Sequence, residues 1–226
     1  MSRIAVVIAA GGAGTRMGGV RKPLLQLGDE PLLAHCLRPF LDRADVHWIV
    51  VALPSDLHLS PPPWLLEDPR VGTVSGGAER TDSVRNALAA VPAEADIVLV
   101  HDAARPLVSS VVIERCVAAA SEGRSAIAAI PVVDTIKEVD EGGRVVSTPD
   151  RRRLWAAQTP QAFPASVLRD AHRRAAAAGL SATDDAALVA RFGATVVVVE
   201  GSPENLKITT SADLALAEAL LTRTSS

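Results

Sequence analysis

The sequence predicts a three-layer α/β/α sandwich around a mostly parallel, Rossmann-like sheet. Two observations predict it: continuous apolar runs recur along the chain, and stretches with helical spacing alternate with them. Apolar runs without polar alternation are typical of strands covered on both faces, as in parallel sheets. Strands that alternate with helices favour right-handed crossovers, which place helices on both sides of the sheet.

The expected strands and helices alternate along most of the chain. Strands are expected in the apolar runs at residues 4–10, 47–53, 96–102, 125–133 and 194–201. Helices are expected in the amphipathic stretches at residues 30–42, 79–91, 109–123 and 211–221. Gly123 is suited to end the third of these helices, and Ser211 is suited to cap the fourth.

One segment breaks the alternation of strands and helices. Residues 135–139 and 144–148 each alternate apolar and polar side chains, and the DEGG stretch between them favours a turn, so a β-hairpin is expected. Its apolar side chains, Ile136, Val139 and Val145, are too few to fold alone. We expect the hairpin to project and to pack either on a second subunit or on its own domain.

Composition narrows the class of protein. With 226 residues, of which 48% are hydrophobic, the chain is expected to form a single domain over residues 1–226. The formal net charge of -3 gives no basic field for nucleic acid, and no apolar stretch reaches the roughly 20 residues of a membrane span. Cys36 and Cys116 lie in apolar helical stretches, which favours reduced core cysteines in a cytoplasmic protein.

Glycines and cations cluster directly after the first expected strand, in the stretch AAGGAGTRMGGVRKP at residues 9–23. Glycine backbone lets N–H groups approach an anion closely, and the arginines and lysine add full charges. The stretch lacks the lysine pattern of a P-loop and the regular spacing of a dinucleotide fingerprint. The residues alone therefore predict a site for a polyanion such as a nucleoside triphosphate, with a plain tight turn as the alternative.

This loop resembles the signature loop of nucleotidyltransferases. Further stretches extend the resemblance in order along nearly the whole chain: GGAERTDSVRNAL (76–88), VHDAARPLV (100–108), DTIKEV (134–139), LWAAQTPQAF (154–163), TDDAALV (183–189) and ENLKITTSADLALAEALL (204–221). Together they are similar to the 2-C-methyl-D-erythritol 4-phosphate cytidylyltransferase family. The loop carries one residue more than the usual family pattern, and its lysine follows Arg21 where the family often has proline, so roles in the loop can shift by one position.

The resemblance implies an enzyme that transfers the cytidylyl group of CTP to 2-C-methyl-D-erythritol 4-phosphate and releases pyrophosphate. The attacking phosphate oxygen is already an anion, so catalysis depends on positioning and charge stabilisation. Mg²⁺ is expected to be held mainly through the CTP phosphates, and no direct protein ligand is assigned. The alternatives are a ribitol 5-phosphate cytidylyltransferase, a hexose 1-phosphate nucleotidyltransferase and an inactive nucleotide-binding regulator.

The resemblance also assigns residues around the nucleotide. It implies catalytic roles for Arg16, Lys22 and Lys207, which would hold the triphosphate and the α-phosphate. The residues expected around the rest of CTP are Ala10, Gly11, Gly12, Gly14, Gly77, Ala78, Ser83 and Asp102. The acidic pair in TDDAALV is expected to begin a helix through Thr183 or Asp184 and is suited to orienting cations.

The alcohol phosphate is assigned to a second group of residues, partly from a neighbouring subunit. Asp102 and Arg105 are expected to face the polyol and the ribose, with an ion pair between them as the alternative. The resemblance implies a homodimer in which an arm at about residues 132–155 completes the neighbour's site. From this arm Thr135 and Arg151 are expected to bind the phosphate, with Thr159 nearby, although Arg152 or Arg153 can replace Arg151.

Overall fold

The structure of the protein, a computed structural model, describes residues 2–11 and 21–224. The main strands are β1 (Ile4–Ala9), β4 (Val46–Leu53), β5 (Val71–Ser75), β6 (Ile97–Asp102), β7 (Ser125–Pro131), β10 (Trp155–Pro164) and β11 (Val196–Glu200). Two short pairs are β2 (Gln26–Leu27) with β3 (Glu30–Pro31), and β8 (Glu138–Val139) with β9 (Val145–Ser147). The helices are α1 (Leu32–Leu41), α2 (Ser55–Leu59), α3 (Arg80–Ala90), α4 (Ser110–Ser121), α5 (Ala165–Ala177), α6 (Asp185–Arg191) and α7 (Ser211–Thr224), with short 3-10 turns η2 (Lys22–Leu24), η3 (Pro63–Leu66) and η4 (Arg151–Arg153).

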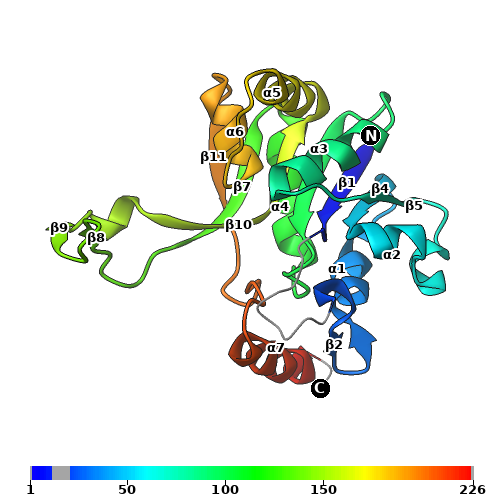
Figure 1. Ribbon diagram of the computed structural model, residues 1–226, viewed down its shortest axis with the longest axis horizontal. Helices are drawn as coiled ribbons and strands as arrows, with labels where there is room; N and C mark the ends of the chain where they lie inside the picture. Colours follow the sequence, from blue (N-terminus) through cyan, green and yellow to red (C-terminus); the bar gives the residue numbers. More distant parts are fainter. Residues whose placement is uncertain (1, 12–20, 225–226) are drawn as a thin grey trace.

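A mostly parallel sheet forms the middle of the molecule (Figure 1). In the described chain its strand order is β11-β7-β10-β6-β1-β4-β5. β10 runs antiparallel to both of its neighbours, β6 and β7, and the other neighbouring pairs are parallel. The predicted strands are therefore confirmed, while β5 and β10 were not expected from the sequence.

Helices cover both faces of this sheet, because successive side chains of a strand point to opposite sides. Val6 and Ile8 of β1 pack in a cluster that includes α1 and α4. Ala5 and Val7 pack on the other face, in a cluster that includes α3, α5 and α6. The predicted α/β/α sandwich is confirmed.

Two helix ends test the predictions about capping. Gly123 follows the end of α4 with φ +79°, a conformation that favours glycine, so its predicted role is confirmed. The predicted cap at Ser211 is wrong. Asp213 Oδ2 accepts a hydrogen bond from the Thr210 backbone N–H at 2.8 Å, and the Asp213 N–H donates to Thr210 Oγ1 at 3.3 Å, so Thr210 caps α7.

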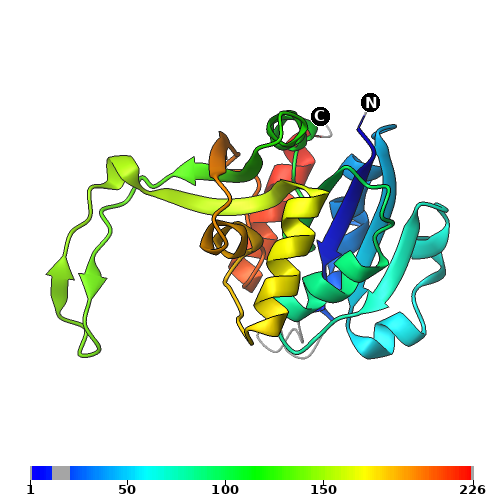
Figure 2. The same ribbon diagram turned by 90° about the horizontal axis from the view of Figure 1, so that it is seen from above.

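The β8–β9 hairpin projects far from the sheet beyond β7 and β10 (Figures 1 and 2). We call the segment 132–155 that carries it the arm. Its base is closed by the Val132 N–H, which donates to the Leu154 carbonyl at 3.0 Å. The arm exposes apolar side chains, with Val133 at 78% and Val145 at 59% exposure. The projecting hairpin is confirmed.

A small third core lies below the sheet, where α7 packs beside the β2–β3 pair (Figure 1). Leu27, Leu32, Ile208 and Ala217 are buried in it. We call this group the α7 core. Its member Ile208 directly follows Lys207, so the cluster holds the segment that carries one of the predicted catalytic cations.

Both cysteines are buried and free. Burial raises the pKa of the Cys116 thiol to about 12. In the part of the chain that the structure describes, no helix combines the length and apolar character needed to cross a bilayer.

Candidate functional site

A pocket of about 460 Å³ opens at the carboxyl ends of β1 and β6. In open parallel sheets ligands bind at this edge. Its lining residues come from the end of β1, from η2, from the turn into α3, from the end of β6 and from the segment before α7: Ala9, Ala10, Gly11, Lys22, Pro23, Gly77, Ala78, Glu79, Arg80, Ser83, Asp102, Ala103, Ala104 and Lys207. Eight of the predicted residues thus meet at one place, counting Ala10, Gly11, Lys22, Gly77, Ala78, Ser83, Asp102 and Lys207.

The turn into α3 is held tightly against the loop after β1. Ser83 Oγ accepts a hydrogen bond from the Gly77 N–H at 3.0 Å and donates to the Glu79 carbonyl at 3.1 Å. A Cβ on Gly11 would lie 2.8 Å from Ser83 Oγ, and one on Gly77 would lie 2.1 Å from Asp82 Cβ. A larger residue at Gly11 would therefore push the loop after β1 away from the turn, and one at Gly77 would distort the turn itself.

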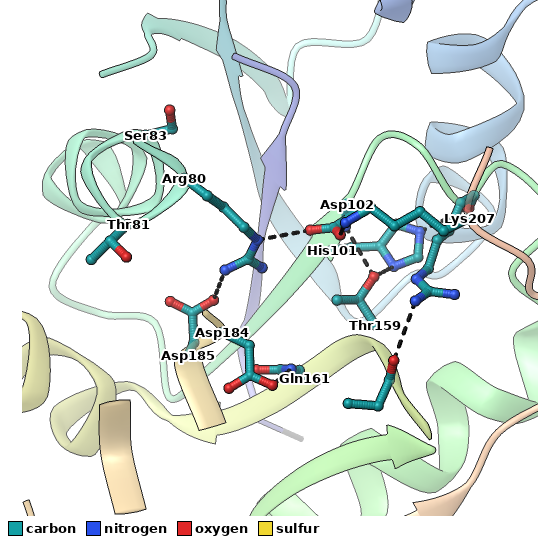
Figure 3. Close-up of polar contacts among 12 residues, drawn as sticks. Arg80, Thr81, Ser83, His101, Asp102, Thr159, Gln161, Asp184, Asp185 and Lys207 are labelled. Carbon is teal, nitrogen blue, oxygen red and sulfur yellow. Dashed lines mark hydrogen bonds and ion pairs between the residues drawn. The ribbon is translucent and has the colours of Figure 1, made fainter. Parts of the chain in front are cut away.

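Asp102 joins two cations at the end of β6 (Figure 3). Its Oδ1 accepts from Arg80 Nε at 2.9 Å, and its Oδ2 accepts from Lys207 Nζ at 2.8 Å. Burial favours the neutral acid, but the charges of Arg80 and Lys207 outweigh it and hold the pKa of Asp102 far below its ordinary value. The pocket therefore contains an ionised carboxylate between two positive groups.

Arg80 continues this arrangement away from the pocket. Its Nη1 donates to Asp185 Oδ2 at 2.7 Å, and Asp185 Oδ1 lies 2.9 Å from His172 Nε2. Burial opposes ionisation of Asp185, yet the hydrogen bond from His172 and the charge of Arg80 lower the pKa of Asp185. The neighbouring Asp184 has another role: its Oδ1 accepts from the Ala187 N–H at 2.7 Å and caps α6, so a cap at Asp184 is confirmed.

A second hydrogen-bonded group lies behind Asp102. Thr159 Oγ1 accepts from the Asp102 N–H at 3.0 Å and lies 3.0 Å from His101 Nδ1. His101 Nε2 lies 3.0 Å from the Arg105 carbonyl, so this nitrogen carries the proton and Nδ1 accepts from the threonine hydroxyl. Burial lowers the pKa of His101 to about 4, which keeps the ring neutral. The structure thus places Thr159 beneath Asp102 instead of on the pocket wall.

Arg105 supports the segment that carries Lys207. Its Nη1 donates to the Asn205 carbonyl at 2.7 Å, and its Nη2 donates to the Ala157 carbonyl at 3.3 Å. The ion pairs of Asp102 are made with Arg80 and Lys207, so the alternative of an Asp102–Arg105 ion pair is not what the described residues form.

The remaining predicted residues fall into two groups. Gly12, Gly14 and Arg16 lie outside the described residues. Thr135 and Arg151 lie on the arm, where both are exposed.

The arginines of η4 differ in their partners. Arg152 is bound by Asp150, to which its Nη2 donates at 2.7 Å. Arg151 donates instead to the Val133 carbonyl at 2.7 Å, which places it against the same part of the arm as Thr135. Of these two arginines, Arg151 is the one that binds the strand of the arm leading to Thr135.

Arg21 and Lys22 are neighbours in the loop but have different surroundings. Lys22 lines the pocket. Arg21 forms an ion pair with Asp56 on α2, with Nη2 2.7 Å from Oδ2. This places Lys22, and not its neighbour Arg21, at the pocket.

Sequence reasoning missed Arg80, Asp185 and His172 as parts of the site. Arg80 lies inside the quoted GGAERTDS stretch, and Asp185 lies in TDDAALV, so both were within recognised motifs. Their contact joins residues 105 positions apart, which no local pattern could reveal. The signal in the sequence for this contact was the acidic pair of TDDAALV, which was expected to be suited to orienting cations.

Comparison with known proteins gives one consistent result. The family model described as 2-C-methyl-D-erythritol 4-phosphate cytidylyltransferase matches residues 4–223. A protein of that name from Saccharopolyspora erythraea is 49% identical over 98% of this chain and 100% of its own length. Another from Syntrophotalea carbinolica is 48% identical over 96% of this chain and 95% of its own length.

Solved structures agree with the sequence comparison. The 2-C-methyl-D-erythritol 4-phosphate cytidylyltransferase from Thermus thermophilus is 38% identical, has a TM-score of 0.82 and is matched over 97% of this chain and 98% of its own. The 4-diphosphocytidyl-2C-methyl-D-erythritol synthase from Anaerococcus prevotii is 28% identical, with a TM-score of 0.87 over 98% of this chain and 99% of its own. The chain therefore belongs to the 2-C-methyl-D-erythritol 4-phosphate cytidylyltransferase family.

Proposed function

We propose that this pocket binds CTP and that the protein transfers the cytidylyl group to 2-C-methyl-D-erythritol 4-phosphate, giving 4-diphosphocytidyl-2-C-methyl-D-erythritol and pyrophosphate. The observation that carries the proposal is the convergence of Lys22, Arg80 and Lys207 on one pocket at the carboxyl ends of β1 and β6. Membership of the cytidylyltransferase family supports this reaction over the ribitol 5-phosphate, hexose 1-phosphate and inactive-regulator alternatives.

The reaction requires positive charge more than a base. A phosphate oxygen of the alcohol substrate attacks the α-phosphorus of CTP, the P–O bond to the β-phosphate breaks, and pyrophosphate leaves with the electron pair. Fixed cations lower the barrier where charge accumulates. In this proposal Lys207 acts at the α-phosphate, while Lys22 and Arg16 hold the β- and γ-phosphates.

The cytidine would lie along the wall formed by small residues. Ala10, Gly11, Gly77 and Ala78 line the pocket and leave space for a pyrimidine ring beside the Ser83 hydroxyl. Gly12 and Gly14 are proposed to supply backbone N–H groups for the phosphates. Asp102 would then face the ribose and the polyol.

Mg²⁺ is proposed to bind with CTP. Among the described residues no group of three His, Cys, Asp or Glu side chains is arranged to hold a metal ion. The Asp102 oxygens are engaged by Arg80 and Lys207. This donor set fits an ion held mainly by phosphate oxygens, where it would neutralise charge on the leaving pyrophosphate.

The arm is proposed to complete the site of a second subunit in a homodimer whose chains are each one nucleotidyltransferase domain. The exposure of its apolar side chains supports this, because too little of the chain's own surface covers them. Thr135 and Arg151 would bind the phosphate of the alcohol substrate, with Arg105 and Thr159 supporting the site from behind. The free, buried cysteines support a cytoplasmic location.

The test is pyrophosphate release with each nucleoside triphosphate crossed against each candidate alcohol phosphate. We expect turnover with CTP and 2-C-methyl-D-erythritol 4-phosphate. Preference for ribitol 5-phosphate, or for a hexose 1-phosphate with another nucleotide, would replace the proposed substrate. Nucleotide binding without pyrophosphate release would point to the regulator.

A further inference from the structure

A line of alternating charges leads from Lys207 at the pocket to residues that do not line it. The order is Lys207, Asp102, Arg80, Asp185 and His172, with contacts of 2.8, 2.9, 2.7 and 2.9 Å between successive partners. Figure 3 shows the first four of these residues. We call this group the ion-pair chain. Each carboxylate in it uses one oxygen for each neighbour, so the position of every member depends on the next.

The two ends of the ion-pair chain differ in burial. The side chain of Lys207 is 44% exposed, whereas those of Asp185 and His172 at the other end are 2% and 3% exposed, with Asp102 at 10% and Arg80 at 24% between them. Asp185 is held at the start of α6 by Arg80 and by His172 of α5, away from the residues that line the pocket. Asp185 therefore belongs to the buried end of the ion-pair chain, and Lys207 at the other end lines the pocket.

Arg80 transmits this anchoring because of its shape. Its planar guanidinium presents Nε to Asp102 and Nη1 to Asp185, and the two bonds together fix the plane of the group. With one carboxylate removed, the guanidinium is free to rotate and to engage both oxygens of Asp102. That would compete directly with the contact between Asp102 Oδ2 and Lys207.

We infer that Asp185 is a positioning residue for the transfer reaction, which sets the place of Lys207 through Arg80 and Asp102 without touching substrate. The inference rests on the proposed function, because it assumes that Lys207 acts on the triphosphate. It assigns the acidic pair of α6 two separate tasks. Asp184 caps the helix, and Asp185 orients the cations of the pocket.

The first test compares Asp185→Asn with Asp184→Asn, two substitutions of neighbouring residues with the same loss of charge. Asparagine is an equally good N-cap, so Asp184→Asn should keep kcat within about twofold. Asp185→Asn should lower kcat by up to about 100-fold, because small displacements of a catalytic group are costly. The Kd for CTP, measured by calorimetry, should change far less than kcat. Equal kcat values for the two variants would overturn the inference.

A double-mutant cycle separates positioning from a general structural effect. If Asp185 acts through Arg80, then Asp185→Asn should cause no further loss of kcat in an Arg80→Gln background. Losses that multiply in the double variant would show that Asp185 acts independently and would reject the inference.

A third variant keeps the inference testable if Asp185→Asn does not fold at the assay temperature. Arg80→Lys keeps the charge but cannot span both carboxylates, so kcat should fall although the chain stays folded by circular dichroism. A normal kcat for Arg80→Lys would contradict the inference. If the unsubstituted enzyme itself releases no pyrophosphate from CTP, the proposed function fails instead.

Discussion

At the pocket, Asp102 is 7% exposed and both of its oxygens accept charged hydrogen bonds, whereas on the arm Val133 is 78% exposed. The pocket residues are held by contacts within one chain. The arm residues form their hydrogen bonds mainly with one another, and the β8–β9 pair comprises only short strands. In the proposed function, this difference corresponds to a chain that builds the nucleotide side of the site by itself and leaves the alcohol phosphate side to be completed by a second subunit.

The largest expected effect tests the pocket. Lys207→Ala removes the cation proposed to act at the α-phosphate, so kcat should fall by about 100- to 1,000-fold. Circular dichroism should show an unchanged fold, because Lys207 is 44% exposed. Lys137→Ala is the matched control, since this lysine lies on the arm and donates to Thr148 Oγ1 at 2.9 Å. A near-normal kcat for Lys207→Ala would remove Lys207 from the mechanism.

The next effect tests the arm. Arg151→Ala should raise the KM for 2-C-methyl-D-erythritol 4-phosphate by about tenfold or more, the usual effect of losing a charged hydrogen bond. The KM for CTP should change much less, because the nucleotide pocket is built elsewhere. Arg152→Ala is the control, as Arg152 is engaged by Asp150. If both variants leave this KM unchanged, the role of the arm in phosphate binding is wrong.

Mixing these two impaired variants, and assaying them with 2-C-methyl-D-erythritol 4-phosphate well below the KM of Arg151→Ala, sharpens the comparison between pocket and arm. Chains with Arg151→Ala and chains with Lys207→Ala should form mixed dimers in which one of the two sites is intact. Random assembly makes half of the dimers mixed, so about a quarter of the parental activity should return. Activity no higher than that of the separate variants would mean that the arm does not serve the neighbouring site.

The smallest effect on turnover is expected behind the pocket, where His101 influences stability instead. Burial lowers the pKa of His101 from 6.5 to about 4, so between these pH values the unfolded chain binds a proton at this residue and the folded chain does not. The resulting stability is present above pH 6.5 and is lost as pH falls towards 4, by about 3 kcal/mol in total.

Urea unfolding between pH 7 and pH 4.5 measures this loss. His101→Gln should flatten the pH dependence of the unfolding free energy, whereas His47→Gln should not, because His47 lies on the surface. An identical slope in the His101 variant and the parent would contradict the assignment.

Much of the fold could be predicted because its strands are uniform apolar runs buried on both faces. β10 was missed because Pro160 interrupts it, and proline within an apolar run argues against a strand. β5 was missed because it is short and contains Gly72. α5 was missed because it buries mainly alanines around Leu168 and is polar on its other side, so its overall hydropathy is low although its apolar residues recur at helical spacing.

The site was predicted as far as its residues lie in continuous motifs. Gly77, Ser83 and Asp102 fall at the ends of predicted strands or at the start of a helix, and the parallel topology brings such ends together. The pairing of Arg80 with Asp185 depends on how the start of α6 lies relative to the start of α3, which local sequence does not encode. The same holds for Thr159, whose place behind Asp102 depends on β10 lying next to β6.

We expect the α7 core to determine when the pocket can first be complete during synthesis of the chain. We expect the sheet to form once β11 has left the ribosome, whereas the cluster of Ile208 and Ala217 with Leu27 and Leu32, which holds the residue next to Lys207, needs α7 as well. A nascent chain that stalls before α7 would therefore carry most of the sandwich and no assembled phosphate site. Turnover would thus require a chain that has been translated through α7.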